Sequence, residues 1–277
     1  MKPTPDSPHA AQPLAGQRVL VTRPTHQADK LCDSLVALGA EVVRFPTLSI
    51  HPTRPTDPAY QTLKNYFLDL DHYKGVIFIS ANAARLGYDW IDQYWPQLPA
   101  ATLWLAVGSA TGRALQQLGL PVTIAGGTMD SEALLALSPL QQLNNEKILI
   151  CRGHAGRELL GESLQQRGAK VDYAELYHRE IPVYSQAEIK SIIYKSAASV
   201  MLVSSGEALT NLASLTKQPG TEISTLIDTP LVVPSQRVAR LAQQNHFNHI
   251  EVAANATDEA MIDAVQSLIA TQGRMEN

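Results

Sequence analysis

Residues able to do chemistry gather at six places in this chain, each directly after a short apolar segment. These places carry hydroxyl, amide or guanidinium side chains, and most of them lead straight into a helical pattern. They are Thr22-Arg23-Pro24, Ser80-Ala81-Asn82, Gly108-Ser109-Ala110-Thr111, Arg152-Gly153-His154, Ser204-Ser205-Gly206 and Pro234-Ser235-Gln236-Arg237. Backbone N–H groups at the start of a helix bind anions, and arginine pairs with carboxylates. The six places therefore predict a site for a ligand that carries several carboxylates or phosphates.

A plainer interpretation is that these hydroxyl and amide side chains only cap helices, since Ser, Thr and Asn are common capping residues. For any one place taken alone, capping is the favoured interpretation. Six such places in one chain favour a shared anion site instead. Ligands of open α/β sheets bind at the carboxyl ends of the strands, which is where all six places are expected to fall.

Tyr177 is the single side chain that packing does not readily explain. It lies in the sequence Leu-Tyr-His-Arg at 176–179, beside cationic and titratable neighbours. A tyrosine hydroxyl can donate a proton or a hydrogen bond to a leaving oxygen. The alternative is a half-buried tyrosine of an edge strand whose hydroxyl lies in water.

Motifs for the common cofactors are missing from the sequence. No G-x-G-x-x-G follows the first apolar segment, no G-x-x-x-x-G-K-[ST] occurs, and Ser204-Ser205-Gly206 lacks the G-x-S-x-G context of a catalytic serine. His246 and His249 are three residues apart, but no cysteine or carboxylate completes a metal-binding set with them. A dinucleotide and a P-loop nucleotide are therefore unsupported, and a surface or capping role is favoured for the two histidines.

A parallel α/β fold is predicted to position these residues. Apolar segments at 19–21, 76–79, 103–107, 148–151, 200–203 and 231–233 read as strands buried on both faces. An apolar stripe with helical spacing runs from Ala28 to Leu38, and Gly39 follows where a left-handed residue ends a helix. Asp130 and Asp258 each precede a helical pattern as the expected N-cap. Strands that alternate with helices predict open parallel sheets.

An internal repeat organises the chain. Residues 18–42 align without a gap on residues 147–171, with eight of 25 positions identical, Arg23 and Arg152 among them. Weaker echoes link 75–85 to 199–209 and 106–119 to 232–245. The extended segments 45–50 and 175–180 hold equivalent places and are either edge strands or crossings between domains. Consecutive elements are usually neighbours, which favours edge strands.

Length and composition set the outer limits. The chain has 277 residues, 45% of them hydrophobic and 17% charged, which suits a soluble protein of two domains. No apolar run is long enough for a membrane helix, no signal peptide is visible, and two cysteines do not make a disulfide framework. A cytoplasmic protein with no membrane partner is predicted. The net charge of −4 gives no general footprint for nucleic acid.

Several motifs together resemble the uroporphyrinogen-III synthase family. They are Val-Leu-Val-Thr-Arg-Pro at 19–24, Phe-Pro-Thr-Leu-Ser-Ile at 45–50, Ile-Phe-Ile-Ser-Ala-Asn-Ala at 77–83, Val-Gly-Ser-Ala-Thr at 107–111, Arg-Gly-His-Ala-Gly-Arg at 152–157, Glu-Leu-Tyr-His-Arg at 175–179 and Val-Pro-Ser-Gln-Arg-Val-Ala at 233–239. Their order and spacing carry the resemblance, which spans residues 18 to about 269.

The resemblance implies a fold of two similar α/β domains of parallel sheet flanked by helices, joined by a two-stranded crossing. The first domain would be discontinuous, with residues 18–46 and 181–277, and the second would hold residues 47–180. This implication replaces the preference for edge strands at 45–50 and 175–180. Independently of the resemblance, the Pro-rich, polar residues 1–17 are expected to be a disordered lead-in.

The resemblance also implies a reaction. The enzyme would be a cyclising lyase of haem biosynthesis that takes hydroxymethylbilane, a linear tetrapyrrole with eight carboxylates, removes its terminal hydroxyl as water, inverts ring D and closes the macrocycle. It would work without a cofactor, in the cleft between the two domains. Transient contact with the upstream deaminase is a further expectation. The alternative, from another class, is a two-lobed small-anion binding or sensor protein without catalysis.

Site residues follow from the strand ends and the resemblance together. Tyr177 matches the tyrosine proposed to assist departure of the hydroxyl. The predicted substrate-binding residues are Thr22, Arg23, Ser80, Asn82, Ser109, Thr111, Arg152, Gly153, Ser204, Ser205, Gly206, Ser235 and Arg237. Gln236-Arg237 departs from the threonine pair of some members, and Arg237 could hold a carboxylate there instead.

Overall fold

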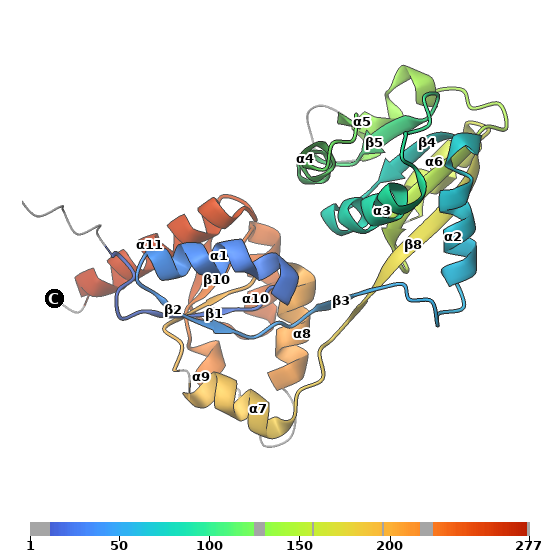
Figure 1. Cartoon of the computed structure of the whole chain (residues 1–277). Coiled ribbons are helices and arrows are strands. Elements are labelled where there is room, and N and C mark those ends of the chain that lie inside the picture. Colours follow the sequence, from blue (N-terminus) through green and yellow to red (C-terminus); the bar gives the residue numbers. More distant parts are fainter. Residues whose placement is uncertain (1–11, 125–130, 157, 196, 217–223, 276–277) are drawn as a thin grey trace, which may run out of the picture. The chain divides into compact units, whose positions relative to one another are not determined.

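A computed structural model describes residues 12–124, 131–156, 158–195, 197–216 and 224–275 (Figure 1). The chain divides into two compact units. Unit 1 comprises the described residues of Met1–Ser49 and Glu180–Asn277, and unit 2 comprises those of Ile50–Arg179. The chain therefore passes from unit 1 into unit 2 after Ser49 and returns after Arg179.

Unit 1 is built on a five-stranded sheet whose order is β11-β10-β9-β1-β2. Every pair of neighbours in this sheet is parallel. The strands are β1 (Arg18–Val21), β2 (Glu41–Arg44), β9 (Val200–Leu202), β10 (Leu231–Val233) and β11 (Ile250–Val252). All five carboxyl ends therefore lie along one edge of the sheet.

Helices cover both faces of this sheet (Figure 1). One face packs against α1 (Thr25–Ala37) and α11 (Asp258–Met275). The other face packs against α7 (Gln186–Lys190), a π-helix (Ser191–Lys195), α8 (Gly206–Thr216), α9 (Ser224–Ile227) and α10 (Gln236–Gln244). Burial on both faces explains why the strands are continuous apolar runs.

Unit 2 is built on a six-stranded sheet whose order is β3-β8-β7-β4-β5-β6. The strands are β3 (Ser49–Pro52), β4 (Tyr73–Phe78), β5 (Leu103–Ala106), β6 (Thr123–Ile124), β7 (Lys147–Gly153) and β8 (Lys170–Glu180). The pairs from β8 to β6 are parallel, so that their carboxyl ends also share one edge.

Helices flank this sheet on both faces as well. One face carries α2 (Tyr60–Leu68), α3 (Ala81–Tyr94) and α4 (Ser109–Gln117). A 3₁₀ turn (Leu70–His72) between α2 and β4 adds Leu70 to the same core. The other face carries α5 (Ser131–Leu135), a 3₁₀ turn (Ser138–Leu140) and α6 (Leu159–Gln166). The predicted class, two α/β units with parallel sheets and a discontinuous first unit, is confirmed.

The repeat of the sequence is visible in the strand orders. The β1–α1–β2 segment of unit 1 and the β7–α6–β8 segment of unit 2 hold the repeated residues 18–42 and 147–171. Read across its sheet, unit 1 has the strand order β2-β1-β9-β10-β11, and unit 2 without β3 has the order β8-β7-β4-β5-β6. The two orders correspond strand by strand, with β1 matching β7 and β2 matching β8. Each copy of the repeat thus contributes strands to both units.

Local predictions can be checked at particular residues. Gly39 and Gly168 have φ of +95° and +92°, so the left-handed residue predicted after each repeated helix is confirmed. Asp258 is the first residue of α11 rather than its N-cap, because the Thr257 hydroxyl accepts the Ala260 N–H. Asp130 lies outside the described residues.

The predicted disordered lead-in needs a correction where it meets the fold. Residues 1–11 lie outside the described part of the chain, but Leu14 is fully buried and its N–H donates to the Leu38 carbonyl at 3.0 Å. Its side chain joins the core beneath α1 and α11, and burying an apolar side chain of this size stabilises the fold. The single leucine among polar and small residues gave no periodic signal for this role.

Candidate functional site

The predicted site residues follow the carboxyl ends of parallel strands in both units. In unit 1 the strand order reverses between β1 and β9, and in unit 2 it reverses between β7 and β4. Open α/β sheets bind ligands beside such reversal points, because the loops there diverge to opposite faces of the sheet.

Tyr177 owes its orientation to an irregularity in β8. Arg152 pairs with Glu175 and Gly153 with Tyr177, so one extra residue of β8 is accommodated between these pairs. Alternation along a strand would place Tyr177 on the face opposite Leu176. The extra residue breaks that alternation, and Leu176 and Tyr177 are both buried in the same core cluster. A bulge has therefore turned the tyrosine toward α3.

Gly153 and Ser80 hold the turned tyrosine in place. A Cβ on Gly153 would lie 2.7 Å from the Tyr177 ring, so only glycine leaves room for it. The Tyr177 hydroxyl lies 3.1 Å from Ser80 Oγ, and Ser80 also caps α3 by accepting the Ala83 N–H at 3.0 Å. With 6% of its surface exposed, Tyr177 is buried and not half-buried as in the alternative interpretation.

Arg152 is an internal anchor in unit 2. Its side chain is 6% exposed, and its guanidinium donates to Glu175 at 3.0 Å and to the Gly156 carbonyl at 3.2 Å. Its Cζ lies 4.2 Å from the centre of the Tyr173 ring, a cation–π contact. Nε is buried without a hydrogen-bond partner among the described residues. The guanidinium expected to face substrate is instead committed to the fold.

His154 and Glu175 complete this cluster; the sequence places His154 at a strand end but does not predict its pairing with Glu175. His154 Nδ1 lies 2.7 Å from Glu175 Oε2, while the His154 side chain is 69% exposed. Burial acts to raise the pKa of Glu175, but hydrogen bonds from His154 and Arg152 outweigh it and hold that pKa below its ordinary value. The sequence feature that could have indicated this cluster is His154, which lies two residues after Arg152 at the end of a predicted strand.

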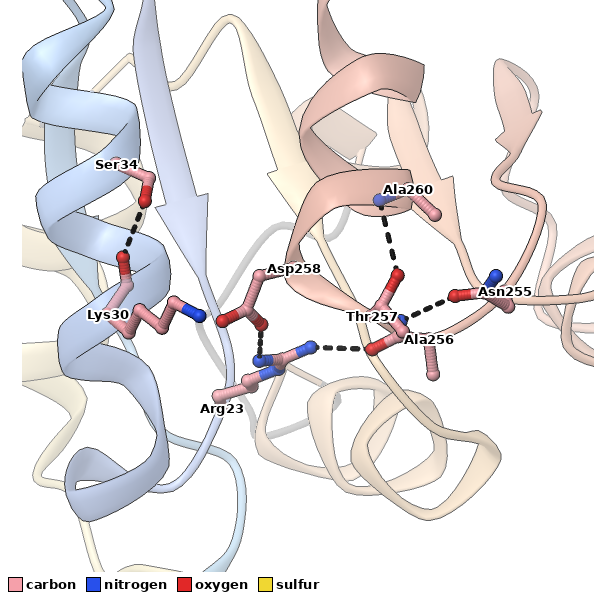
Figure 2. Close-up of polar contacts among 8 residues, drawn as sticks. All are labelled: Arg23, Lys30, Ser34, Asn255, Ala256, Thr257, Asp258 and Ala260. Atoms are coloured by element: carbon pink, nitrogen blue, oxygen red, sulfur yellow. Dashed lines mark hydrogen bonds and ion pairs between the residues drawn. The ribbon is translucent and has the colours of Figure 1, made fainter. Parts of the chain in front are cut away.

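Arg23 has an equivalent internal role in unit 1. Figure 2 shows its guanidinium bonded to the Asp258 carboxylate and to the Ala256 carbonyl, at the start of α11. Thr22 beside it is fully buried and donates its hydroxyl to the Leu202 carbonyl at 2.9 Å. Neither side chain is free to meet a ligand in this structure, because each is satisfied within the unit.

The other strand ends of unit 1 remain accessible. Ser205 and Ser235 are half-buried caps, since they accept the N–H groups of Ala208 at 3.1 Å and Val238 at 3.4 Å. The capping interpretation is thus confirmed for these two serines and for Ser80. Ser204 is half-buried and Gly206 is buried. Arg237 is exposed on α10, and a Cβ on Gly206 would lie 3.4 Å from its Nη1.

The remaining residues predicted in unit 2 lie at two helix starts. Asn82 is half-buried in the first turn of α3. Ser109 is the exposed first residue of α4, whose N-cap Gly108 has φ of +82° and supplies no side-chain cap. Thr111, two residues further, is 4% exposed and packs inward. The amino end of α4 therefore presents backbone N–H groups and the Ser109 hydroxyl.

Other features of the described residues do not extend the site. A hollow of about 410 Å³ between β11 and α11 is lined by Glu251, Glu259 and Asp263, a charge that repels a carboxylate ligand. No three His, Cys, Asp or Glu side chains of the described residues are placed to hold a metal. Burial raises the pKa of the Cys151 thiol, so it offers no thiolate. Among the described helices, none has the length and apolar character needed to cross a membrane.

Known proteins resemble this chain over most of its length. Residues 29–263 match the family described as uroporphyrinogen-III synthase HemD. The uroporphyrinogen-III synthase of Salmonella typhimurium is 33% identical over 90% of this chain and 99% of its own length. That of Escherichia coli is 32% identical with the same coverage.

Solved structures agree on the fold. A mutant uroporphyrinogen III synthase of Thermus thermophilus aligns with a TM-score of 0.60 at 15% identity, over 92% of this chain and all of that one. The uroporphyrinogen-III synthetase of Helicobacter pylori gives 0.57 at 12% identity, over 91% and 99%. The alternative of a binding or sensor protein without catalysis has no support in these comparisons. With a family match over most of its length and two relatives above 30% identity, the chain belongs to the uroporphyrinogen-III synthase family.

Proposed function

We propose that this chain is a cyclising lyase that converts hydroxymethylbilane into uroporphyrinogen III, with loss of water and inversion of ring D. The family membership supports this reaction. The observation that carries it to particular atoms is the Tyr177 hydroxyl, held 3.1 Å from Ser80 Oγ at the edge where the strands of unit 2 end.

Tyr177 can serve both proton transfers that this reaction needs. The leaving hydroxyl departs as water only if it gains a proton, and a phenol positioned within hydrogen-bond reach can donate one. Closure of the macrocycle later releases a proton from a pyrrole carbon, and the phenolate can take it back. Substrate therefore becomes product plus water, and the tyrosine ends as it began. Ser80 stabilises the phenolate by donating its own hydroxyl hydrogen.

Carboxylate binding is assigned to the accessible strand ends. In unit 2 these are Asn82 and Ser109, and in unit 1 they are Ser204, Ser205, Ser235 and Arg237. The buried glycines Gly153 and Gly206 are assigned a contact through their backbone only. Thr22, Arg23, Thr111 and Arg152 are assigned to the support of these loops, because they are buried or already paired. Binding by many hydroxyls and amides positions a reactive, self-cyclising substrate, which can supply much of the rate.

Direct transfer of substrate from the upstream deaminase belongs to the same proposal. The linear tetrapyrrole closes on its own to the uninverted isomer, so a short lifetime in free solution favours the correct product. Transient contact between the two enzymes would provide that short lifetime.

The isomer of the product tests the proposed function. Hydroxymethylbilane is generated in situ, the products are oxidised, and the porphyrin isomers are separated with and without this protein. We expect the type III isomer to dominate with the protein and the type I isomer without it. If the type I isomer alone forms in both samples, the proposed function is wrong.

A further inference from the structure

Three charged side chains of unit 2 form a continuous chain of contacts at the ends of β7 and β8. Arg152 donates to one oxygen of Glu175 at 3.0 Å, and His154 Nδ1 lies 2.7 Å from the other oxygen. The carboxylate thus joins a buried guanidinium on one side to an exposed imidazole on the other.

The carboxylate also determines which nitrogen of His154 faces outward. A carboxylate only accepts hydrogen bonds, so Nδ1 must carry the proton in that contact. Nε2 is then the nitrogen on the far side of the ring, in a side chain that is 69% exposed. None of the hydrogen bonds described for unit 2 involves Nε2.

A buried arginine and a strained loop residue hold the exposed His154 ring in place. Arg152 is buried with Nε unpaired, a cost that its contacts with Glu175, Gly156 and Tyr173 must offset. The loop that carries His154 includes Ala155 at φ +55°, a left-handed conformation that is unfavourable for a residue with a Cβ. Strained loops of this kind occur where a side chain has to be held in one position.

We propose that His154 Nε2 binds a side-chain carboxylate of the tetrapyrrole, with Glu175 and Arg152 as positioning residues. Nε2 donates to that carboxylate when both ring nitrogens carry a hydrogen, and because Arg152 offsets the charge of Glu175, the cluster then presents a cationic donor to an anion. The proposal rests on the proposed function and adds one side-chain contact to those assigned to unit 2, from a residue beside Arg152, which is itself buried.

Steady-state kinetics of His154→Ala test the contact. We expect KM to rise about tenfold with kcat within twofold of the wild type, since the loss is one hydrogen bond to a charged group. His72→Ala is the matched control, because His72 is an exposed histidine of the same unit next to the amino end of β4, at the opposite edge of the sheet. It should leave both constants unchanged.

The positioning role is tested by non-additivity. Glu175→Gln should raise KM severalfold in the wild-type background and should add nothing in the His154→Ala background, because coupled residues lose their effect together. A purely structural role for Glu175 would give the same increment in both backgrounds. Circular dichroism of each variant checks that it folds.

Equilibrium binding separates this proposal from the proposed function. Uroporphyrin, the oxidised product with the same eight carboxylates, is titrated into both proteins. His154→Ala is expected to bind it about tenfold more weakly than the wild type. Equal affinity, or an unchanged KM, overturns the assignment of His154 even if the wild type makes the type III isomer. A wild type that yields only type I isomer overturns the proposed function, and the uroporphyrin titration still decides the role of His154.

Discussion

Arg23 in unit 1 and Arg152 in unit 2 occupy the same position of the internal repeat and show what the two units share. Each follows the core of the first repeated strand, pairs with one carboxylate and donates to one main-chain carbonyl. The carboxylates come from different elements, because Asp258 begins α11 whereas Glu175 lies on the neighbouring strand β8. Both arginines therefore hold the end of a strand in place, but the carboxylates that pair with them come from different parts of the fold.

The two units differ in the residues around those anchors. At the same offset, Pro46 matches Glu175 and Leu48 matches Tyr177, so unit 1 lacks both the imidazole-carboxylate pair and the phenol. Nearby, Thr47 is fully buried and donates its hydroxyl to the Ala208 carbonyl at 3.0 Å, which ties this segment to α8. Under the proposed function, the two units would share carboxylate binding, and unit 2 would add the proton transfer.

The largest expected effect is on stability, and both anchors should show it. Arg152→Met and Arg23→Met each leave a half-buried carboxylate without its guanidinium, and we expect each to lower the free energy of unfolding by about 2 kcal/mol. Denaturant unfolding measures the loss. At a temperature where both variants stay folded, Arg152→Met should raise KM for the tetrapyrrole more than Arg23→Met does, because only Arg152 also positions His154. A rise of KM in Arg23→Met of equal size would break the comparison.

Glycine-to-alanine changes at the two strand ends should differ sharply. The Cβ of Gly153→Ala would lie 2.7 Å from the Tyr177 ring, and such overpacking costs about 1–3 kcal/mol. The displaced hydroxyl should also slow the single-turnover rate. In Gly206→Ala the nearest atoms would be 3.4 Å away, an ordinary contact, so its stability should hold or rise slightly. Equal losses from both variants would show that the ring is free to move.

The smallest expected effect is on the pH dependence of stability. The pKa of Glu175 is below its ordinary value of 4.5 in the folded protein. The stability it contributes is therefore present above pH 4.5 and is lost as pH falls through the lowered folded pKa. The free energy of unfolding is measured for the wild type and for Glu175→Gln at neutral and at acid pH. The wild type should be the more stable at neutral pH, and its advantage should shrink as the pH falls. A difference independent of pH would argue that the carboxylate is not paired as described.

Sequence alone predicts the scaffold better than the roles of individual side chains. Strands such as β7 and β9 are buried on both faces and show this directly as apolar runs. The burial of Arg152 depends on Glu175 arriving from a neighbouring strand, which no local pattern reveals. The orientation of Tyr177 depends on a bulge, and one extra residue in β8 leaves no sequence signal.

Single-turnover kinetics of Tyr177→Phe test the central claim, that the phenol of unit 2 transfers the proton. Tyr184→Phe is the control, because Tyr184 is a half-buried tyrosine of unit 1 that donates to the Pro46 carbonyl at 2.8 Å. We expect the rate of type III product formation to fall about 100-fold in Tyr177→Phe, the scale of a lost general acid, and to stay within twofold in Tyr184→Phe. An unchanged single-turnover rate in Tyr177→Phe would contradict the account.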